Sequence, residues 1–207
     1  YLKNIGFNKE LLEEFVWNNE KKTVEDWLRK GAFLEDEGNS LDAVTGKARY
    51  TNHFHNPLKS WGSAGLTDLQ RGESSLIWAQ DSLKQPAALG GDWSWKTVRD
   101  FFYKALTAST DSERQANFAK TFRGLGHQIH LIQDASQPAH VRNDAHPIDG
   151  LGWAEGLETW SKKNSGKINL FASGSSLPQV ALNISYDNYV PITQFIDTKQ
   201  YKGSLSP

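Results

Sequence analysis

The sequence ERQANFAKTFRGLGHQIHLIQD, residues 113–134, decides the fold class of this chain. Its apolar residues recur at the spacing of one face of an α-helix: Phe118, Phe122, Leu125, Ile129 and Ile132. His130 and Asp134 are four positions apart, so both side chains leave the same face of that helix. The stretch predicts a long amphipathic helix, from Asp111 to Asp134, that carries two groups able to bind a cation.

The residues that follow add further ligand types. Pro138 is expected to stop the helix, and His140 lies two positions later on the exit loop, where it can turn back toward the same face. Imidazole nitrogen and carboxylate oxygen together suit zinc, and the chain contains no cysteine. A His-x-x-x-Asp pair alone is a weak signal, but with His140 and His146 beside it the segment predicts a metal site.

The rest of the chain also shows mostly helical patterns. Further helices are predicted at residues 8–19, 23–30, 73–84, 94–108, 152–162 and 188–198, with Asn8 and Thr23 as N-caps and Gly31 ending the second. Residues 32–72 lose this periodicity and are rich in acidic and histidine side chains, which is typical of a functional loop. We expect an all-α multi-helix bundle with almost no sheet, forming a single domain over 1–207, with metals between facing helices.

Composition limits the function classes. The chain has 23 Lys and Arg against 24 Asp and Glu, so no overall basic field indicates nucleic acid as a stable partner. No apolar run is long enough to span a membrane, and no signal peptide is present, although the chain begins with Tyr1. We therefore expect a processed or trimmed product whose substrate is selected by a local pocket.

Three segments carry a resemblance to a known superfamily. GAFLEDE (31–37), RYTNHFHNP (49–57) and LGHQIHLIQDASQPAHVRND (125–144) resemble the zinc-dependent phospholipase C and S1/P1 nuclease superfamily in order and approximate separation. The similarity spans about Gly31 to Glu158. It implies a mostly helical domain that holds three zinc ions in a cleft lined by long loops and hydrolyses phosphate esters of phospholipids or single-stranded nucleic acids. It also implies export, to the periplasm or out of the cell.

The resemblance also implies a set of metal ligands. One zinc would be bound by residues of all three segments: Asp36, His53, His130 and Asp134. Asp134 would bridge to another ion, which His140 would also bind. In this superfamily the activated water is the nucleophile, and the carboxylates of Asp36, as proton acceptor, and Asp134, as bridge, would be catalytic.

This chain departs from the superfamily pattern at two places. A His and an acid one helical turn apart should complete the second ion's ligands, but the residue four before Glu158 is Ala154. We therefore assign His146 with Glu158, and Glu155 is a rival for the acid. The third zinc needs an N-terminal Trp and a nearby His, and this chain has no His before His53. That segment precedes Tyr1 or one site is absent, which gives two to three zinc ions.

Other polar residues near the motifs have simpler interpretations. We expect His55 and His127 to pack or to orient ligands, and Glu35 and Glu37 to face water, although a shift of one residue would make Glu35 the ligand in place of Asp36.

Three residues beside the motifs have two interpretations each. Arg142 and Asn143 can contact a phosphate, or Asn143 can cap a turn. Trp61 is either a core residue or part of an apolar wall for a substrate.

Three functions are compatible with such a site. A phospholipase C-like phosphodiesterase, which contacts a membrane surface, suits a near-neutral chain with no Lys/Arg cluster beside the motifs. A single-strand nuclease of the S1/P1 type needs aromatic side chains that stack on bases and a cleft lined with Lys or Arg. A non-catalytic zinc-binding domain needs zinc whose coordination is saturated by the protein. The sequence leaves the oligomeric state open.

Overall fold

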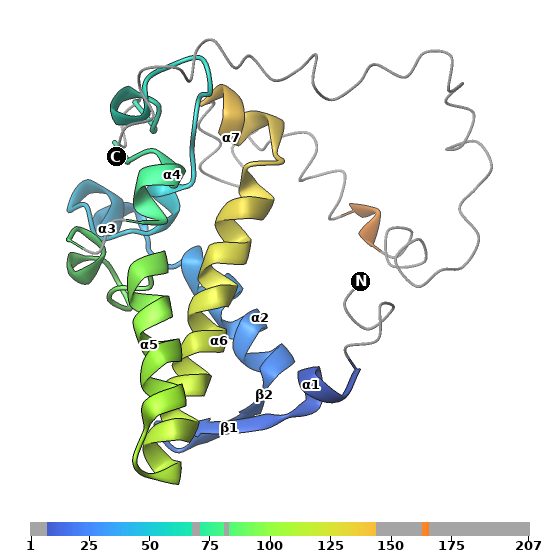
Figure 1. Cartoon of the computed structure of the whole chain (residues 1–207). Helices are drawn as coiled ribbons and strands as arrows, with labels where there is room; N and C mark the ends of the chain where they lie inside the picture. The colour runs from blue at the N-terminus through green and yellow to red at the C-terminus, as the bar shows by residue number, and fades with distance from the viewer. Residues whose placement is uncertain (1–7, 68–70, 81–82, 144–162, 166–207) are drawn as a thin grey trace, which may run out of the picture. The chain divides into compact units, whose positions relative to one another are not determined.

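A computed structural model describes residues 8–67, 71–80, 83–143 and 163–165 of the chain (Figure 1). The elements follow the order α1 (Asn8–Leu12), β1 (Glu14–Trp17), β2 (Glu20–Thr23), α2 (Val24–Glu35), α3 (Ser40–Val44), η2 (Tyr50–Asn52), η3 (Trp61–Ser63), α4 (Ser75–Trp78), η4 (Gln85–Ala87), α5 (Trp95–Thr107), α6 (Asp111–Asp134) and α7 (Pro138–Arg142). The described part is mostly helical and its sheet has two strands, so the predicted helical class is confirmed.

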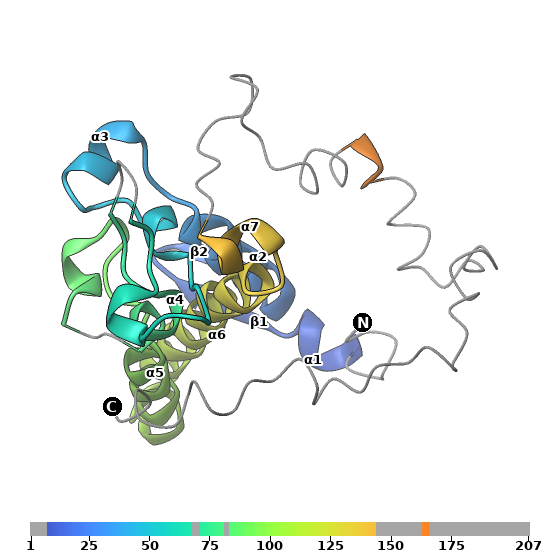
Figure 2. The same cartoon turned by 90° about the horizontal axis from the view of Figure 1, so that it is seen from above.

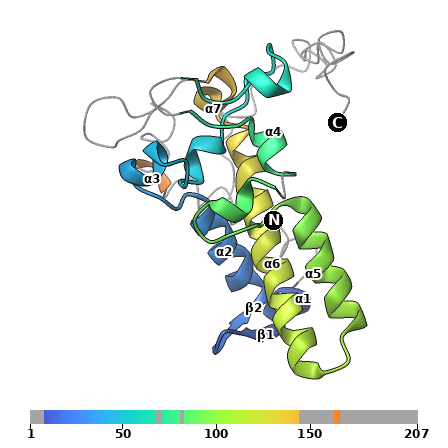
Figure 3. The same ribbon diagram turned by 90° about the vertical axis from the view of Figure 1, so that its left-hand side faces the viewer.

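Helix α6 is the central element of the described residues up to Asn143. It packs between α2 and α5, as Figures 1 and 3 show from two directions. The short helix α7 follows at its C-terminal end, which Figure 2 shows from above. The prediction of one domain over the whole chain stays a prediction, because most residues after Asn143 lie outside the described part.

The two longest predicted helices are confirmed, and their caps explain where they begin. Thr110 caps α6: its hydroxyl accepts from the Glu113 amide at 3.2 Å, and the Glu113 carboxylate accepts from the Thr110 amide at 3.3 Å. Ser94 caps α5 by accepting from the amide of Thr97. These caps start both helices where the sequence predicts them.

Helix α2 runs four residues beyond Gly31, so the prediction that Gly31 ends it is wrong. Gly31 lies where α2 crosses α6, and a Cβ there would lie 1.8 Å from the carbonyl oxygen of Arg123. Gly126 is its counterpart on α6, because a Cβ there would lie 2.1 Å from the Leu28 carbonyl oxygen. These glycines allow two backbones to touch, and this contact brings the end of α2 beside the last turns of α6.

The predicted helix at 8–19 is wrong beyond Leu12, where a β-hairpin replaces it. Asn18 and Asn19 form its turn with φ of 51° and 61°, a conformation that asparagine tolerates better than most residues. Phe15 faces α6, with its ring 5.1 Å from that of Phe118 and 5.5 Å from that of Phe122. The run Phe15 to Trp17 is rich in aromatic and β-branched residues, which is compatible with a strand.

The other boundaries also differ from the predicted ones. The described part of 73–84 is helical over Ser75–Trp78 alone, and the Trp78 carbonyl accepts from the Gln85 side chain at 2.5 Å rather than continuing a helix. The predicted loop at 32–72 contains α3, η2 and η3. Pro138 begins α7, so His140 lies on a short helix and not on an exit loop. The helices predicted at 152–162 and 188–198 lie outside the described residues.

Among the described helices, none is both long and apolar enough to cross a membrane.

Candidate metal site

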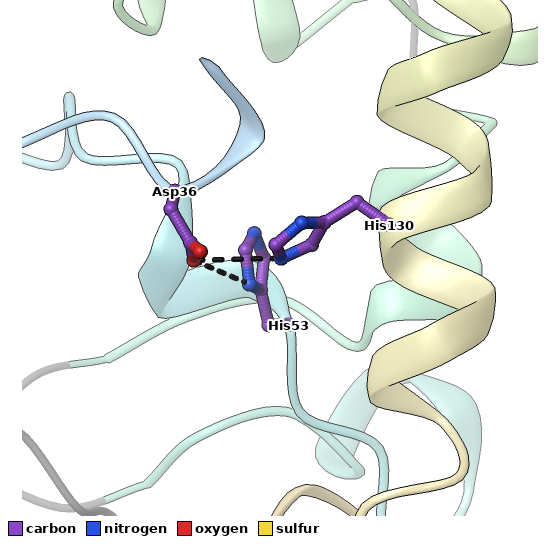
Figure 4. Close-up of side chains that lie close together, drawn as sticks. All are labelled: Asp36, His53 and His130. Atoms are coloured by element: carbon purple, nitrogen blue, oxygen red, sulfur yellow. Dashed lines mark ion pairs between the residues drawn. The ribbon is translucent and has the colours of Figure 1, made fainter. Parts of the chain in front are cut away.

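Three segments meet at the C-terminal ends of α2 and α6. Asp36 caps the end of α2, His53 follows η2 directly, and His130 lies in the last turns of α6. Figure 4 shows their side chains facing one another, and one ligand atom from each lies within 4.8 Å of the others. This group can hold a metal ion.

Asp134 and His140 extend the cluster. Oδ2 of Asp134 lies 2.8 Å from Nδ1 of His53 and 3.1 Å from Nε2 of His130. Nδ1 of His140 lies 3.5 Å from the same oxygen. All five predicted ligands that lie in the described part of the chain are therefore brought together. His146, Glu155 and Glu158 lie outside it.

The separations are close to those of a zinc site. Ligand atoms about 2.0 to 2.2 Å from a tetrahedral ion lie roughly 3.3 to 3.6 Å from one another. Oδ1 of Asp36 lies 3.5 Å from Nδ1 of His53 and 3.4 Å from Nε2 of His130. The contacts of Asp134 are a few tenths of an ångström shorter, so small side-chain movements would fit all four atoms around one ion.

The buried atoms of the cluster that make no hydrogen bond within the described residues include Nε2 of His130 and Oδ2 of Asp134. Buried polar groups are normally hydrogen-bonded, and unsatisfied ones are found where an ion or a catalytic function explains them. Both atoms point into the cluster through the ion-pair contacts above. The donor set therefore fits a cation with nitrogen and oxygen ligands.

Charge pairing dominates the electrostatics of the cluster. Burial opposes ionisation of Asp134, but the His130 and His53 rings outweigh it and lower the Asp134 pKa. Burial likewise lowers the His130 pKa, yet Asp134 and Asp36 outweigh it and raise this pKa to about 10. The His53 pKa is also raised, because contacts with Asp134 and Glu35 exceed the effect of burial. The cluster thus stabilises positive charge at its centre.

Backbone hydrogen bonds hold the motif segments together. The His55 amide donates to the His140 carbonyl at 3.0 Å, and the Ser75 amide donates to the Phe54 carbonyl at 3.0 Å. The rings of Phe54 and His140 stack with centroids 4.6 Å apart. Gly72 packs so closely that a Cβ there would lie 1.7 Å from the Thr51 carbonyl oxygen. The segment that carries His53 is therefore fixed against α7.

Glu35 is fully buried, so the prediction that it faces water is wrong. Its carboxylate accepts from Nε of Arg49 at 2.8 Å, from Nε1 of Trp78 at 2.8 Å and from Nδ1 of His127 at 2.5 Å. Burial would raise the Glu35 pKa, but His127, His53 and Arg49 lower it well below its usual value. Glu37, two residues later, is exposed as predicted.

A signal for this burial exists in the sequence. Trp27, Gly31 and Glu35 are spaced four apart and form one buried stripe of α2. Arg49 had no place in the predicted site, although it is 1% exposed and holds Glu35 in the core.

The two remaining motif histidines support neighbours of the cluster. His127 stacks on Trp93 with centroids 5.1 Å apart, and burial lowers its pKa to about 4, so the ring is neutral at pH 7. Nδ1 of His55 pairs with the Ser74 hydroxyl at 2.8 Å. These are the positions expected of residues that pack or orient ligands.

The three residues with two interpretations each lie on or beside short helices. Asn143 caps α7 in a left-handed conformation and donates to the Gly65 carbonyl at 2.7 Å, which fits the capping interpretation. Trp61 begins η3 and is half-buried. Arg142 is the last residue of α7.

No protein-family model, curated protein or solved structure matches this chain. The resemblance to the phospholipase C and S1/P1 nuclease superfamily stays a prediction that rests on the three quoted segments.

Proposed function

We propose that this chain is a zinc-dependent hydrolase of phosphate esters, with the fold of the phospholipase C and P1 nuclease superfamily and phospholipase C-like cleavage of a phosphodiester. The convergence of Asp36, His53, His130, Asp134 and His140 from three distant segments supports this function most strongly. Two imidazoles and two carboxylates at these separations suit zinc better than the hard cations calcium and magnesium, which prefer oxygen.

Each ligand has a defined part in this proposal. Asp36, His53, His130 and Asp134 hold one ion, and Asp134 with His140 begins a second, which His146 and Glu158 complete. Zinc bound here would lower the pKa of a water molecule and polarise a phosphoryl oxygen. The Asp36 side chain is 62% exposed, so its carboxylate reaches solvent and can accept a proton from the attacking water.

The surroundings favour an ester with an apolar part. Leu58, which follows the His53 motif, is 72% exposed, and Trp61 lies three residues further on. The chain's net charge of −1 provides no general attraction for a long polyanion. We therefore place a phospholipid first among the substrates, with contact at a membrane surface and no stable nucleic-acid complex.

The test compares substrates on one preparation. Zinc-loaded protein should release phosphorylated headgroup from phosphatidylcholine faster than it degrades single-stranded DNA or RNA. Asp134→Ala should abolish this activity, whereas Asp100→Ala, which removes an exposed acid from α5, should not change it. Cleavage of the oligonucleotides alone would replace the proposal with a nuclease. Zinc binding without hydrolysis of any ester would indicate a non-catalytic zinc domain.

A further inference from the structure

Glu35 is a carboxylate with very little freedom to move. Its Oε2 accepts from Arg49 and His127, and its Oε1 accepts from Trp78. A carboxylate offers about four acceptor positions, so these donors leave one, on Oε1. All three donors are themselves buried, with 1 to 4% exposure.

The donors are anchored in turn. Arg49 donates to the carbonyls of Leu89 and Gly91 and to the Gln85 side chain, and its guanidinium lies 5.1 Å from the centre of the Trp78 ring. Together these contacts fix the carboxylate in a single orientation. Well-packed apolar residues could stabilise the end of α2 as well as a buried ion pair does. The presence of a buried carboxylate here therefore calls for another explanation.

His53 lies between this network and the metal cluster. Its Nδ1 faces the cluster, 2.8 Å from Asp134 and 3.5 Å from Asp36. Its Nε2, on the far side of the ring, is buried without a hydrogen bond in the described part of the chain and lies 3.7 Å from Oε1 of Glu35. That oxygen is the one with an acceptor position left.

We infer that Glu35 is a positioning residue for the metal ligand His53: it accepts the Nε2 proton and so leaves the Nδ1 lone pair to the ion. This inference rests on the proposed zinc function. A neutral imidazole carries one proton, and only the nitrogen without it can bind a metal. Shortening the 3.7 Å contact by roughly 0.8 Å would give an ordinary hydrogen bond. An ionised acceptor behind the ring also makes the imidazole a more basic ligand.

The first test uses the unaltered chain. Nitrogen-15 NMR of the zinc-loaded protein should show His53 protonated at Nε2 and coordinated through Nδ1. Coordination through Nε2, or a proton on Nδ1, would overturn the inference. This readout does not depend on hydrolysis. A protein that binds zinc but cleaves no ester would reject the proposed function, and the tautomer of His53 would still decide the role of Glu35.

The second test compares two matched variants. Glu35→Gln keeps the shape of the side chain but removes its charge, and Glu37→Gln makes the same change at an exposed position two residues away. We expect Glu35→Gln to weaken zinc binding by about 10- to 100-fold, as loss of such carboxylate partners does. Glu37→Gln should match the unaltered protein.

Zinc titrations should be run where circular dichroism shows all proteins folded. A purely structural Glu35 would lower the melting temperature of Glu35→Gln and leave the zinc affinity of the folded protein unchanged, and this result would reject the inference. If Glu35→Gln does not fold, the tautomer of His53 in the unaltered chain decides the question.

Discussion

Replacing Gly31 with alanine should damage the metal site without changing any ligand. The new Cβ would lie 1.8 Å from the Arg123 carbonyl oxygen, and ordinary contacts of this kind are about 3.3 Å, so α2 and α6 must separate by roughly 1.5 Å. Asp36 follows α2 directly and His130 lies on α6, so their 3.4 Å contact should open to roughly 5 Å, beyond the spacing of ligands on one zinc ion.

The expected change in stability is the balance of two effects. Overpacking lowers the free energy of unfolding by about 1 to 3 kcal/mol. Replacing a mid-helix glycine with alanine raises it by about 1 kcal/mol, because alanine has the higher helix propensity. We therefore expect a net loss of about 0 to 2 kcal/mol in the free energy of unfolding, together with weaker zinc binding by the folded protein.

Urea unfolding and zinc titration of the same samples measure both effects. Gly62→Ala is the matched control, because a Cβ at Gly62 would meet nothing within 4 Å. If Gly31→Ala and Gly62→Ala have the same stability and the same zinc affinity, the close crossing of α2 and α6 does not position the site.

Asp134→Ala should remove activity and bound zinc together, whereas His127→Ala should weaken zinc binding by about 10- to 100-fold. Metal analysis and turnover measurements test both variants. Equal effects of the two changes would mean that the roles of Asp134 and His127 are misassigned. Zinc binding at pH 7 should release at least one proton, because the His130 pKa of about 10 keeps that ring protonated without metal, and zinc affinity should therefore rise with pH up to about 10. Calorimetry in buffers of different ionisation enthalpy measures this release, and its absence would contradict the charge pairing. Thr110→Ala should lower the free energy of unfolding by about 1 kcal/mol and leave zinc affinity unchanged. The reason is distance, because 20 residues at 1.5 Å per residue place this cap about 30 Å from His130. A large loss of zinc affinity would show that the whole helix is coupled to the site.

Local patterns predict the part of the site that lies on one helix. His130 and Asp134 share a face because four residues make about one helical turn, and α6 has the predicted bounds. The meeting of α6 with Asp36 and His53 has no such local signal. It depends on the glycine crossing of α2 and α6, which the sequence shows only as two glycines, and a glycine such as Gly31 is also typical of a helix end.

The buried charges were harder to predict. The spacing of Trp27, Gly31 and Glu35 indicates a buried stripe on α2, but it does not reveal the partners of Glu35, because Arg49, Trp78 and His127 come from three other segments. The hairpin is difficult to predict for a different reason. A short run such as Phe15 to Trp17 is apolar enough for a helix or a strand, and only packing against α6 decides between them.

The most direct measurement is a crystal structure of the zinc-loaded chain with anomalous diffraction data at the zinc absorption edge. We expect a zinc peak between Asp36, His53, His130 and Asp134, with Nδ1 of His53 and Nε2 of His130 at about 2.0 to 2.2 Å from the ion. A zinc-saturated protein in which the anomalous peaks lie elsewhere, and in which Asp36, His53 and His130 bind no ion, would contradict the account.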